Sequence, residues 1–186
     1  MPQIPSKFID PEQVSIDSRW FNQADEYKGN IQVDGEDDAH QWEIEFLTTP
    51  LTPEDKRELN AILNAQKGRQ GVFTLPDLLP YMSADTSYNV DTAHAKGDEV
   101  INVKNLSATA KVGDFINISS HSKTYQIYAA TVSSISIVPP LQQAVIDNEI
   151  ITPAVFTVRM KSDVNTLELD GKKYQSKQVV ALMEVI

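Results

Sequence analysis

The chain has 186 residues, a formal net charge of −10 and no cysteine. A chain of this length can bury a core without disulfides or metals, and the lack of cysteine excludes disulfides, thiolate zinc sites and a cysteine nucleophile. Binding to DNA needs clustered lysine and arginine, so this acidic composition argues against sequence-specific nucleic-acid binding.

The N-terminal segment and the hydropathy of the chain bear on its location. The first seven residues, MPQIPSK, lack the basic start and the apolar stretch of a signal peptide. No uninterrupted apolar run approaches the roughly 20 residues that a helix needs to cross a bilayer. We therefore expect no membrane partner, and a soluble chain that is not exported or that travels inside a larger particle.

The clearest strand in the sequence lies within residues 41–46. Its residues alternate between an apolar face and a polar face, which is typical of a half-buried strand. The apolar face consists of Trp42, Ile44 and Phe46, and the polar face consists of Gln41, Glu43 and Glu45. Upstream, Asp34-Gly35 suits a tight turn. The segment therefore predicts an antiparallel hairpin, with the acidic residues 36–38 near its solvated tip.

Two aromatic residues, Trp20 and Phe21, follow a weakly alternating segment. Neighbouring residues of an extended strand point to opposite faces. Trp20 and Phe21 therefore cannot both point into the core, and one of them is a candidate interface residue.

A single helix is expected over residues 53–67. Thr52 is a suitable N-cap, Pro53 takes the first helical position, and Asp55 nearly completes a capping box. An apolar stripe through Leu59 and the following turn faces one side only. Residues 67–68, a lysine and a glycine, are expected to close the helix with a cation in its last turn and glycine just past its end.

The middle of the chain predicts a second β unit. Residues 76–90 have no periodic pattern and are interpreted as a linker. Turn signals then separate four short segments rich in β-branched residues, as in a small sandwich or barrel. The four expected strands cover residues 100–103, 115–118, 125–128 and 135–138.

Further strands are expected near the C-terminus, at residues 155–160, 166–169, 172–174 and 179–186. The last of these is expected to complete the first sheet. The fold is thus predicted to be mainly β with one α-helix, an α+β fold. Residues 1–78 and 153–186 would form one domain, into which residues 79–152 are inserted as a small β-sandwich or barrel domain.

The chemistry-bearing residues do not form a recognisable active site. His40, His94 and His121 are far apart in sequence, lack ligand spacing and are expected at the surface. Ser119 and Ser120 precede His121 without a nucleophile elbow, and no phosphate-binding glycine loop is present. We therefore predict no catalytic residues, no metal and no cofactor.

Two further binding sites can be weighed against simpler interpretations. Residues 34–38 lack the ligand spacing of a calcium loop. Exposed aromatics would suit a carbohydrate-binding module, but most of these residues occupy inward strand positions, so core packing is the better account. The aromatics concerned are Trp20, Phe21, Trp42, Phe46 and Phe73.

The order of these features resembles the distal tail and tail-tip ring proteins of tailed bacteriophages. The helix segment LTPEDKREL (residues 51–59) is followed by KGRQGVFTLPD (residues 67–77). VPPL (residues 138–141) and TPAVFTVR (residues 152–159) follow in the order seen in those proteins. Each motif is weak by itself, but the order and spacing of the motifs are more specific.

This resemblance implies a structural protein of the virion tail, assembled in the host cytoplasm. A tail-tube-like β-sandwich domain with a flanking helix would form a hexameric ring around the DNA channel, between the tail tube protein and the baseplate hub or tail-tip proteins. Arg69 and Arg159 occupy matching positions and would be structural, each pairing with a carboxylate. The alternatives are a carbohydrate-binding module, another head–tail or neck ring protein, and a hydrolase with dispersed residues.

The acidic excess admits two interpretations. It serves solubility alone, or it keeps a channel wall from sticking to passing DNA. For the second, the candidate lumen-facing acids are Glu36, Asp37, Asp38, Glu43 and Glu45.

Overall fold

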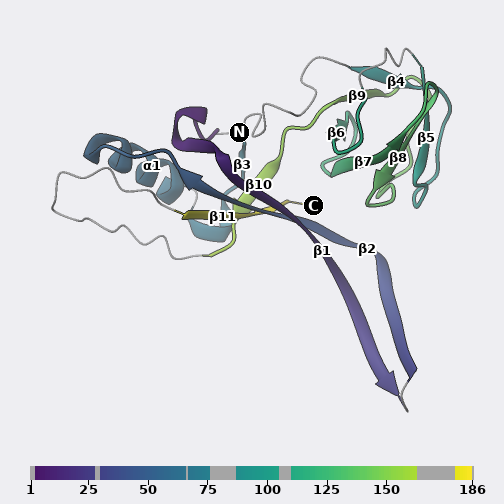
Figure 1. Ribbon diagram of the computed structural model, residues 1–186, viewed down its shortest axis with the longest axis horizontal. Helices are drawn as coiled ribbons and strands as arrows, with labels where there is room; N and C mark the ends of the chain where they lie inside the picture. The colour runs from purple at the N-terminus through teal and green to yellow at the C-terminus, as the bar shows by residue number, and fades with distance from the viewer. Residues whose placement is uncertain are drawn as a thin grey trace. The chain divides into compact units, whose positions relative to one another are not determined.

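The computed structural model describes residues 3–27, 30–65, 67–75, 87–104, 110–162 and 179–185, and of residues 21–27 and 30–39 it describes the backbone alone. This part of the chain is mainly β with a single α-helix (Figure 1). The elements are η1 (Ser6–Phe8), β1 (Ile9–Tyr27), β2 (Asn30–Thr48), α1 (Pro53–Ala65), η2 (Gly68–Gln70), β3 (Phe73–Thr74), β4 (Tyr88–Val90), β5 (Val100–Lys104), β6 (Phe115–Ile118), β7 (Thr124–Ala130), β8 (Ser134–Val138), β9 (Ile150–Pro153), β10 (Thr157–Met160) and β11 (Val179–Glu184).

By its internal contacts the chain divides into two units. Unit 1 comprises Met1–Asp17, Trp42–Pro80 and Val155–Val185, and unit 2 comprises Ser18–Gln41 and Tyr81–Ala154. Residues 18–41, which the sequence-based division placed with the ring domain, group by contacts with the second β unit.

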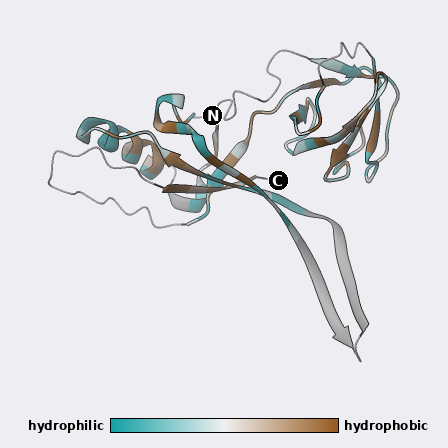
Figure 2. Cartoon of the chain, in the orientation of Figure 1, coloured by the Kyte–Doolittle hydropathy of each residue, from teal (hydrophilic) through white to brown (hydrophobic). Residues whose placement is uncertain are grey.

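Unit 1 contains a five-stranded sheet with the order β1-β2-β11-β10-β3. β11 lies between β2 and β10 and is antiparallel to both, with Leu182 opposite Ile44 on one side and Met160 on the other. The expectation that the last strand completes the first sheet is confirmed. Figure 2 shows β11 as predominantly hydrophobic, in agreement with its central position.

Helix α1 begins as its sequence predicts. The Asp55 N–H donates to Thr52 Oγ1 at 3.2 Å, and the Thr52 N–H donates to the Asp55 carboxylate at 3.2 Å. This reciprocal pair satisfies backbone donors that have no partner within the helix. Leu59 and Leu63 are buried, whereas the flanking polar residues form the hydrophilic stretches visible on α1 in Figure 2.

The end of α1 differs from the expectation. The helix ends at Ala65, and Lys67 adopts the left-handed conformation (φ 53°) that the sequence assigned to glycine. The Lys67 N–H donates to the Asn64 carbonyl at 3.0 Å. Lys67 therefore follows the helix and is not a cation of its last turn.

Unit 2 contains a closed barrel with the order β4-β5-β8-β7-β6-β9. The four predicted strands, now β5 to β8, are confirmed, and the structure selects the barrel from the two architectures left open. Two short strands were missed: β4 lies in the supposed linker, and β9 precedes the expected strand at 155–160. The barrel closes through the pairing of β4 with β9, and each of them also pairs with a predicted strand.

The barrel encloses a mainly aliphatic core that includes two tyrosines, Tyr88 and Tyr125. Its buried residues are Tyr88, Val90, Ile101, Val103, Ile116, Ile118, Tyr125, Ile127, Ile135, Ile137, Leu141, Val145 and Ile151. The turn before β6 contains Gly113, which adopts a positive φ of 100° that a side chain would strain.

The turn expected at Asp34-Gly35 is wrong. Residues 30–48 form one continuous strand, β2, beside β1, so these residues and the acidic residues 36–38 lie within a strand. Pairing with the 19-residue strand β1 overrides the local turn preference. The strands expected at 166–169 and 172–174 lie outside the described residues. No helix in the described part of the chain is long and apolar enough to span a membrane.

Candidate functional site

The expectation of surface histidines is wrong for two of the three. His40 and His121 are buried, and each ring has a polar neighbour inside its unit that offsets part of the desolvation cost. His40 Nε2 lies 2.9 Å from Ser18 Oγ, and His121 Nδ1 lies 2.7 Å from the Tyr125 hydroxyl. Among the described residues, no group of three or more histidines and carboxylates is placed to hold a metal ion.

The Ser119–His121 segment is organised by structural hydrogen bonds. The Tyr125 hydroxyl accepts the Gln142 N–H at 3.1 Å and also lies within hydrogen-bond distance of His121 Nδ1. The Ser120 N–H donates to the Glu149 carboxylate at 2.9 Å. Burial lowers the pKa of His121, while Glu149 and the Ala144 carbonyl oppose the shift. The imidazole is thus held by a tyrosine.

Lys123 is a buried cation that the sequence did not reveal. Its side chain is 1% exposed, and its Nζ donates to the His40 carbonyl at 2.9 Å. The Trp20 ring meets the His40 ring edge-on, with centroids 4.7 Å apart. Burial, together with the Lys123 charge, lowers the pKa of His40 to about 3. Lys123 occurs in a short polar run without periodicity, so no pattern identifies it as buried.

The low pKa of His40 predicts that unit 2 loses stability as the pH falls from 7 to 5. The unfolded chain takes up a proton near pH 6.5, whereas folded His40 stays neutral until about pH 3. The free energy of unfolding should therefore fall below pH 6.5, by at most about 1.4 kcal/mol per pH unit for one histidine. His121, whose pKa is also lowered, adds to the loss with the same sign.

Urea unfolding at several pH values measures this slope. His40→Gln should make the slope shallower, and Lys123→Met should also do so, because removal of the cation raises the pKa of His40. The control is His94→Gln, a change at the histidine between β4 and β5. An unchanged slope in His40→Gln would contradict the assignment.

The five-stranded sheet of unit 1 carries two of the candidate lumen-facing acids, Glu43 and Glu45, on β2. Glu43 and Glu45 lie on the same face of β2, opposite the buried Trp42, Ile44 and Phe46, as the alternation predicted. Glu43 is not a free charge, since its carboxylate lies 2.6 Å from Lys161 Nζ. Glu45 is exposed, and its carbonyl lies 3.5 Å from Ser15 Oγ.

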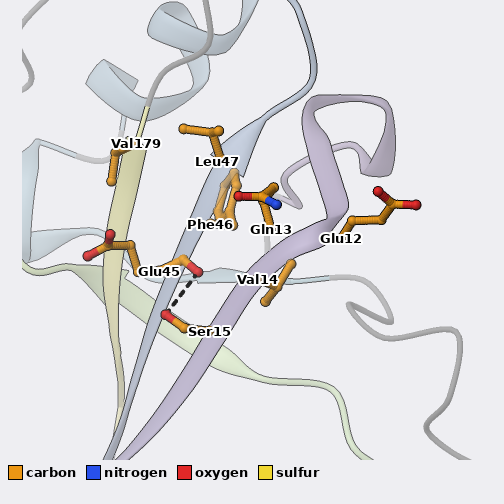
Figure 3. Close-up of a pocket in the computed structure, with 8 residues that line it drawn as sticks. All are labelled: Glu12, Gln13, Val14, Ser15, Glu45, Phe46, Leu47 and Val179. Atoms are coloured by element: carbon orange, nitrogen blue, oxygen red, sulfur yellow. Dashed lines mark hydrogen bonds between the residues drawn. The ribbon is translucent and has the colours of Figure 1, made fainter.

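A hollow of about 380 Å³ lies on this sheet where β1, β2 and β11 meet. Figure 3 shows the Glu12 and Glu45 side chains pointing away from each other on opposite sides of it. Apolar side chains line the space between them, with Gln13 and Ser15 as polar neighbours. The apolar lining consists of Val14, Phe46, Leu47 and Val179.

The two arginines singled out by the resemblance have different surroundings. Arg69 Nε donates to the Lys161 carbonyl at 2.9 Å, which ties η2 to the end of β10. Arg159 is half-buried on β10, and its Nε is buried without a hydrogen-bond partner among the described residues. Arg69 thus binds a backbone carbonyl, and its expected pairing with a carboxylate stays a prediction.

The remaining candidate residues are only partly described. Trp20 is 40% exposed in addition to its contact with His40, which suits the expected interface role. The side chains of Phe21, Glu36, Asp37 and Asp38 lie outside the described residues. Trp42, Phe46 and Phe73 are buried, so the prediction of core packing is confirmed for these three.

Glu184 is a further buried polar residue that sequence reasoning missed. Its side chain is inaccessible, and its carboxylate accepts the Trp42 N–H at 3.4 Å, just beyond the last paired residues of β2 and β11. A signal was present, because Glu184 has the same strand parity as the buried Val180 and Leu182.

Comparison with known proteins adds no assignment. No family model matches the chain, and no curated protein matches it.

Proposed function

We propose that the chain is a ring-forming structural subunit of the distal-tail type. In this role the unit 1 sheet forms a tube-like domain in a hexameric ring of the virion tail. The ring joins the tail tube to the baseplate hub around the DNA channel. The chain performs no catalysis and needs no cofactor.

The long hairpin of β1 and β2 is the observation that carries this proposal. Each strand has 19 residues, against the roughly 3–10 usual in globular proteins. In the described part of the chain, β2 pairs with β11 over residues 43–47. A two-stranded ribbon is marginally stable in water by itself, so a ribbon of this length needs packing partners beyond its own two strands. Residues 18–41 find some of these partners in unit 2, where the buried Lys123 donates to the His40 carbonyl. We expect neighbouring molecules to supply the others. A ring supplies such neighbours at every position.

Some of the acidic residues of β2 support the proposal that this sheet lines the DNA channel. Lys161 neutralises Glu43, which leaves Glu45 and the acids of residues 36–38 as candidates for a lumen that repels DNA. A ring structure with these acids on its outer rim, or with a positively charged bore, would contradict this part of the proposal.

Electron microscopy of the purified full chain, combined with mass photometry, tests the ring. We expect closed rings with a central channel, in equilibrium with monomers at low concentration. A chain that stays monomeric at every concentration, and is absent from any tail particle, would defeat the proposal.

A variant with a shorter β1–β2 hairpin tests whether ring formation needs the long hairpin. Deletion of residues 22–27 and 30–35 removes six residues from each strand, an even number that keeps the faces of both strands in phase. The variant should fold but form rings poorly. Normal rings from this variant would show that the hairpin is not needed.

A further inference from the structure

The charges of the unit 1 sheet are segregated between its two edges. In β1 and β2, residues 9–17 and 42–48, every charged residue is acidic. In the segments of η2, β3 and β10, residues 67–75 and 157–161, every charged residue is basic. The acids are Asp10, Glu12, Asp17, Glu43 and Glu45, and the bases are Lys67, Arg69, Arg159 and Lys161.

β11 separates the two charged edges, since the strand order places it between β2 and β10. The Glu43–Lys161 pair spans it and shows that the two sets attract within one copy. Glu12 and Glu45 on the acidic side are exposed, and so is Lys67 on the basic side. The sheet therefore presents opposite charges at opposite edges.

The hollow lies on the acidic edge and has the chemistry of a site for a basic side chain. Its apolar lining suits the aliphatic stem of a lysine or arginine, whose charged end can then reach a carboxylate. Glu12 and Glu45 lie on opposite sides of the lining and their side chains point away from each other (Figure 3), so a basic side chain laid across the lining would meet one of these carboxylates at the rim of the hollow.

At the basic edge, the backbone of β3 is already paired, so a neighbouring copy would contact side chains there. The outer side of β3 is taken by the N-terminal segment, where Gln3 bridges to Thr74 and the Ile4 N–H donates to the Thr74 carbonyl at 3.3 Å. Arg69 is already bound to the Lys161 carbonyl. Lys67, exposed in the turn after α1, is therefore the foremost cation of this edge.

We infer that the hollow receives Lys67 from a second copy of this chain, so that copies associate head to tail, acidic edge against basic edge. The argument for a second copy is that one sheet carries both complementary edges. A contact between different edges is heterologous and closes into a ring when the rotation permits. The inference rests on the proposed ring and names its subunit contact.

Charge reversal with exchange tests this contact. The pocket variant carries Glu12→Lys and Glu45→Lys, and the edge variant carries Lys67→Glu. In a solution of either variant alone, the hollow of one copy faces a residue of the same charge on the next copy. The association of each variant should therefore weaken about tenfold or more. A mixture of the two should assemble, because each pocket then meets an opposite charge on the other variant. The triple variant that combines all three changes should assemble by itself.

The control is Glu54→Lys on α1, a charge reversal at an exposed residue that neither lines the hollow nor belongs to the basic segments, and this variant should assemble like the wild type. Sedimentation velocity at salt concentrations from about 0.05 M to about 1 M should show association that weakens with salt. Circular dichroism and urea unfolding show which variants fold. If a reversal prevents folding, Glu12→Gln with Glu45→Gln replaces it, with weaker association expected.

Two outcomes overturn the inference. In one, the pocket and edge variants assemble like the wild type. In the other, each fails to assemble and neither the mixture nor the triple variant recovers. If the wild type forms rings in either case, the proposed function stands and only this contact is wrong. If the wild type forms no rings, the proposed function itself fails.

Discussion

Tyr125→Ala is expected to destabilise the barrel by about 3–5 kcal/mol, the usual cost of truncating a large buried aromatic residue. Tyr125 is fully buried among the aliphatic residues of the barrel core. Its hydroxyl also bonds His121 and the backbone of Gln142, and both lose their partner in the variant. The cost therefore combines a cavity with unsatisfied polar groups.

Tyr128, three residues further along β7, is the matched control. Its side chain is 49% exposed, and its hydroxyl donates to Glu99 at 3.2 Å at the surface. Tyr128→Ala should cost less than about 1 kcal/mol. Tyr125→Phe should fall between the two, at about 1–3 kcal/mol, because only the hydroxyl is removed.

Urea unfolding followed by fluorescence measures these differences. Trp20 belongs to unit 2 and Trp42 to unit 1, so Trp42→Phe leaves the signal of unit 2 alone. Equal free energies of unfolding for Tyr125→Ala and Tyr128→Ala would show that the interior of the barrel is not as described.

Leu182→Ala is expected to destabilise unit 1 by about 2–5 kcal/mol. Leu182 is fully buried on β11, the strand that joins β2 to β10. A cavity at this position weakens the packing on both sides of the central strand, so the two halves of the sheet should separate at lower urea concentration.

Val179 provides the control on the same strand. It is 57% exposed at the start of β11, and Val179→Ala should cost less than about 1 kcal/mol. Trp42, buried in unit 1, reports the transition, and Tyr125→Ala should leave it unchanged. A loss in Val179→Ala as large as that in Leu182→Ala would contradict the central position of β11.

The sequence predicted the faces of two acidic residues at the candidate site, but neither the hollow nor the partners of these residues. Alternation correctly placed Glu43 and Glu45 on the polar face of β2, because a strand points successive side chains to opposite faces. It did not reveal that Lys161, 118 residues away, neutralises Glu43. It also missed the buried Lys123 and Glu184, since polarity alone assigns lysine and glutamate to the surface.

The sequence by itself determined the features that depend on neighbouring residues. These include the cap that Thr52 and Asp55 form on α1, the alternation in β2, the strands β5 to β8 and the single helix. Only the tertiary structure decided the closure of the barrel, the continuation of β2 through Asp34-Gly35 and the burial of His40. In each of these cases the structure depends on contacts between segments far apart in sequence, through strand pairing or burial away from water. Local sequence patterns do not indicate which distant segments will meet.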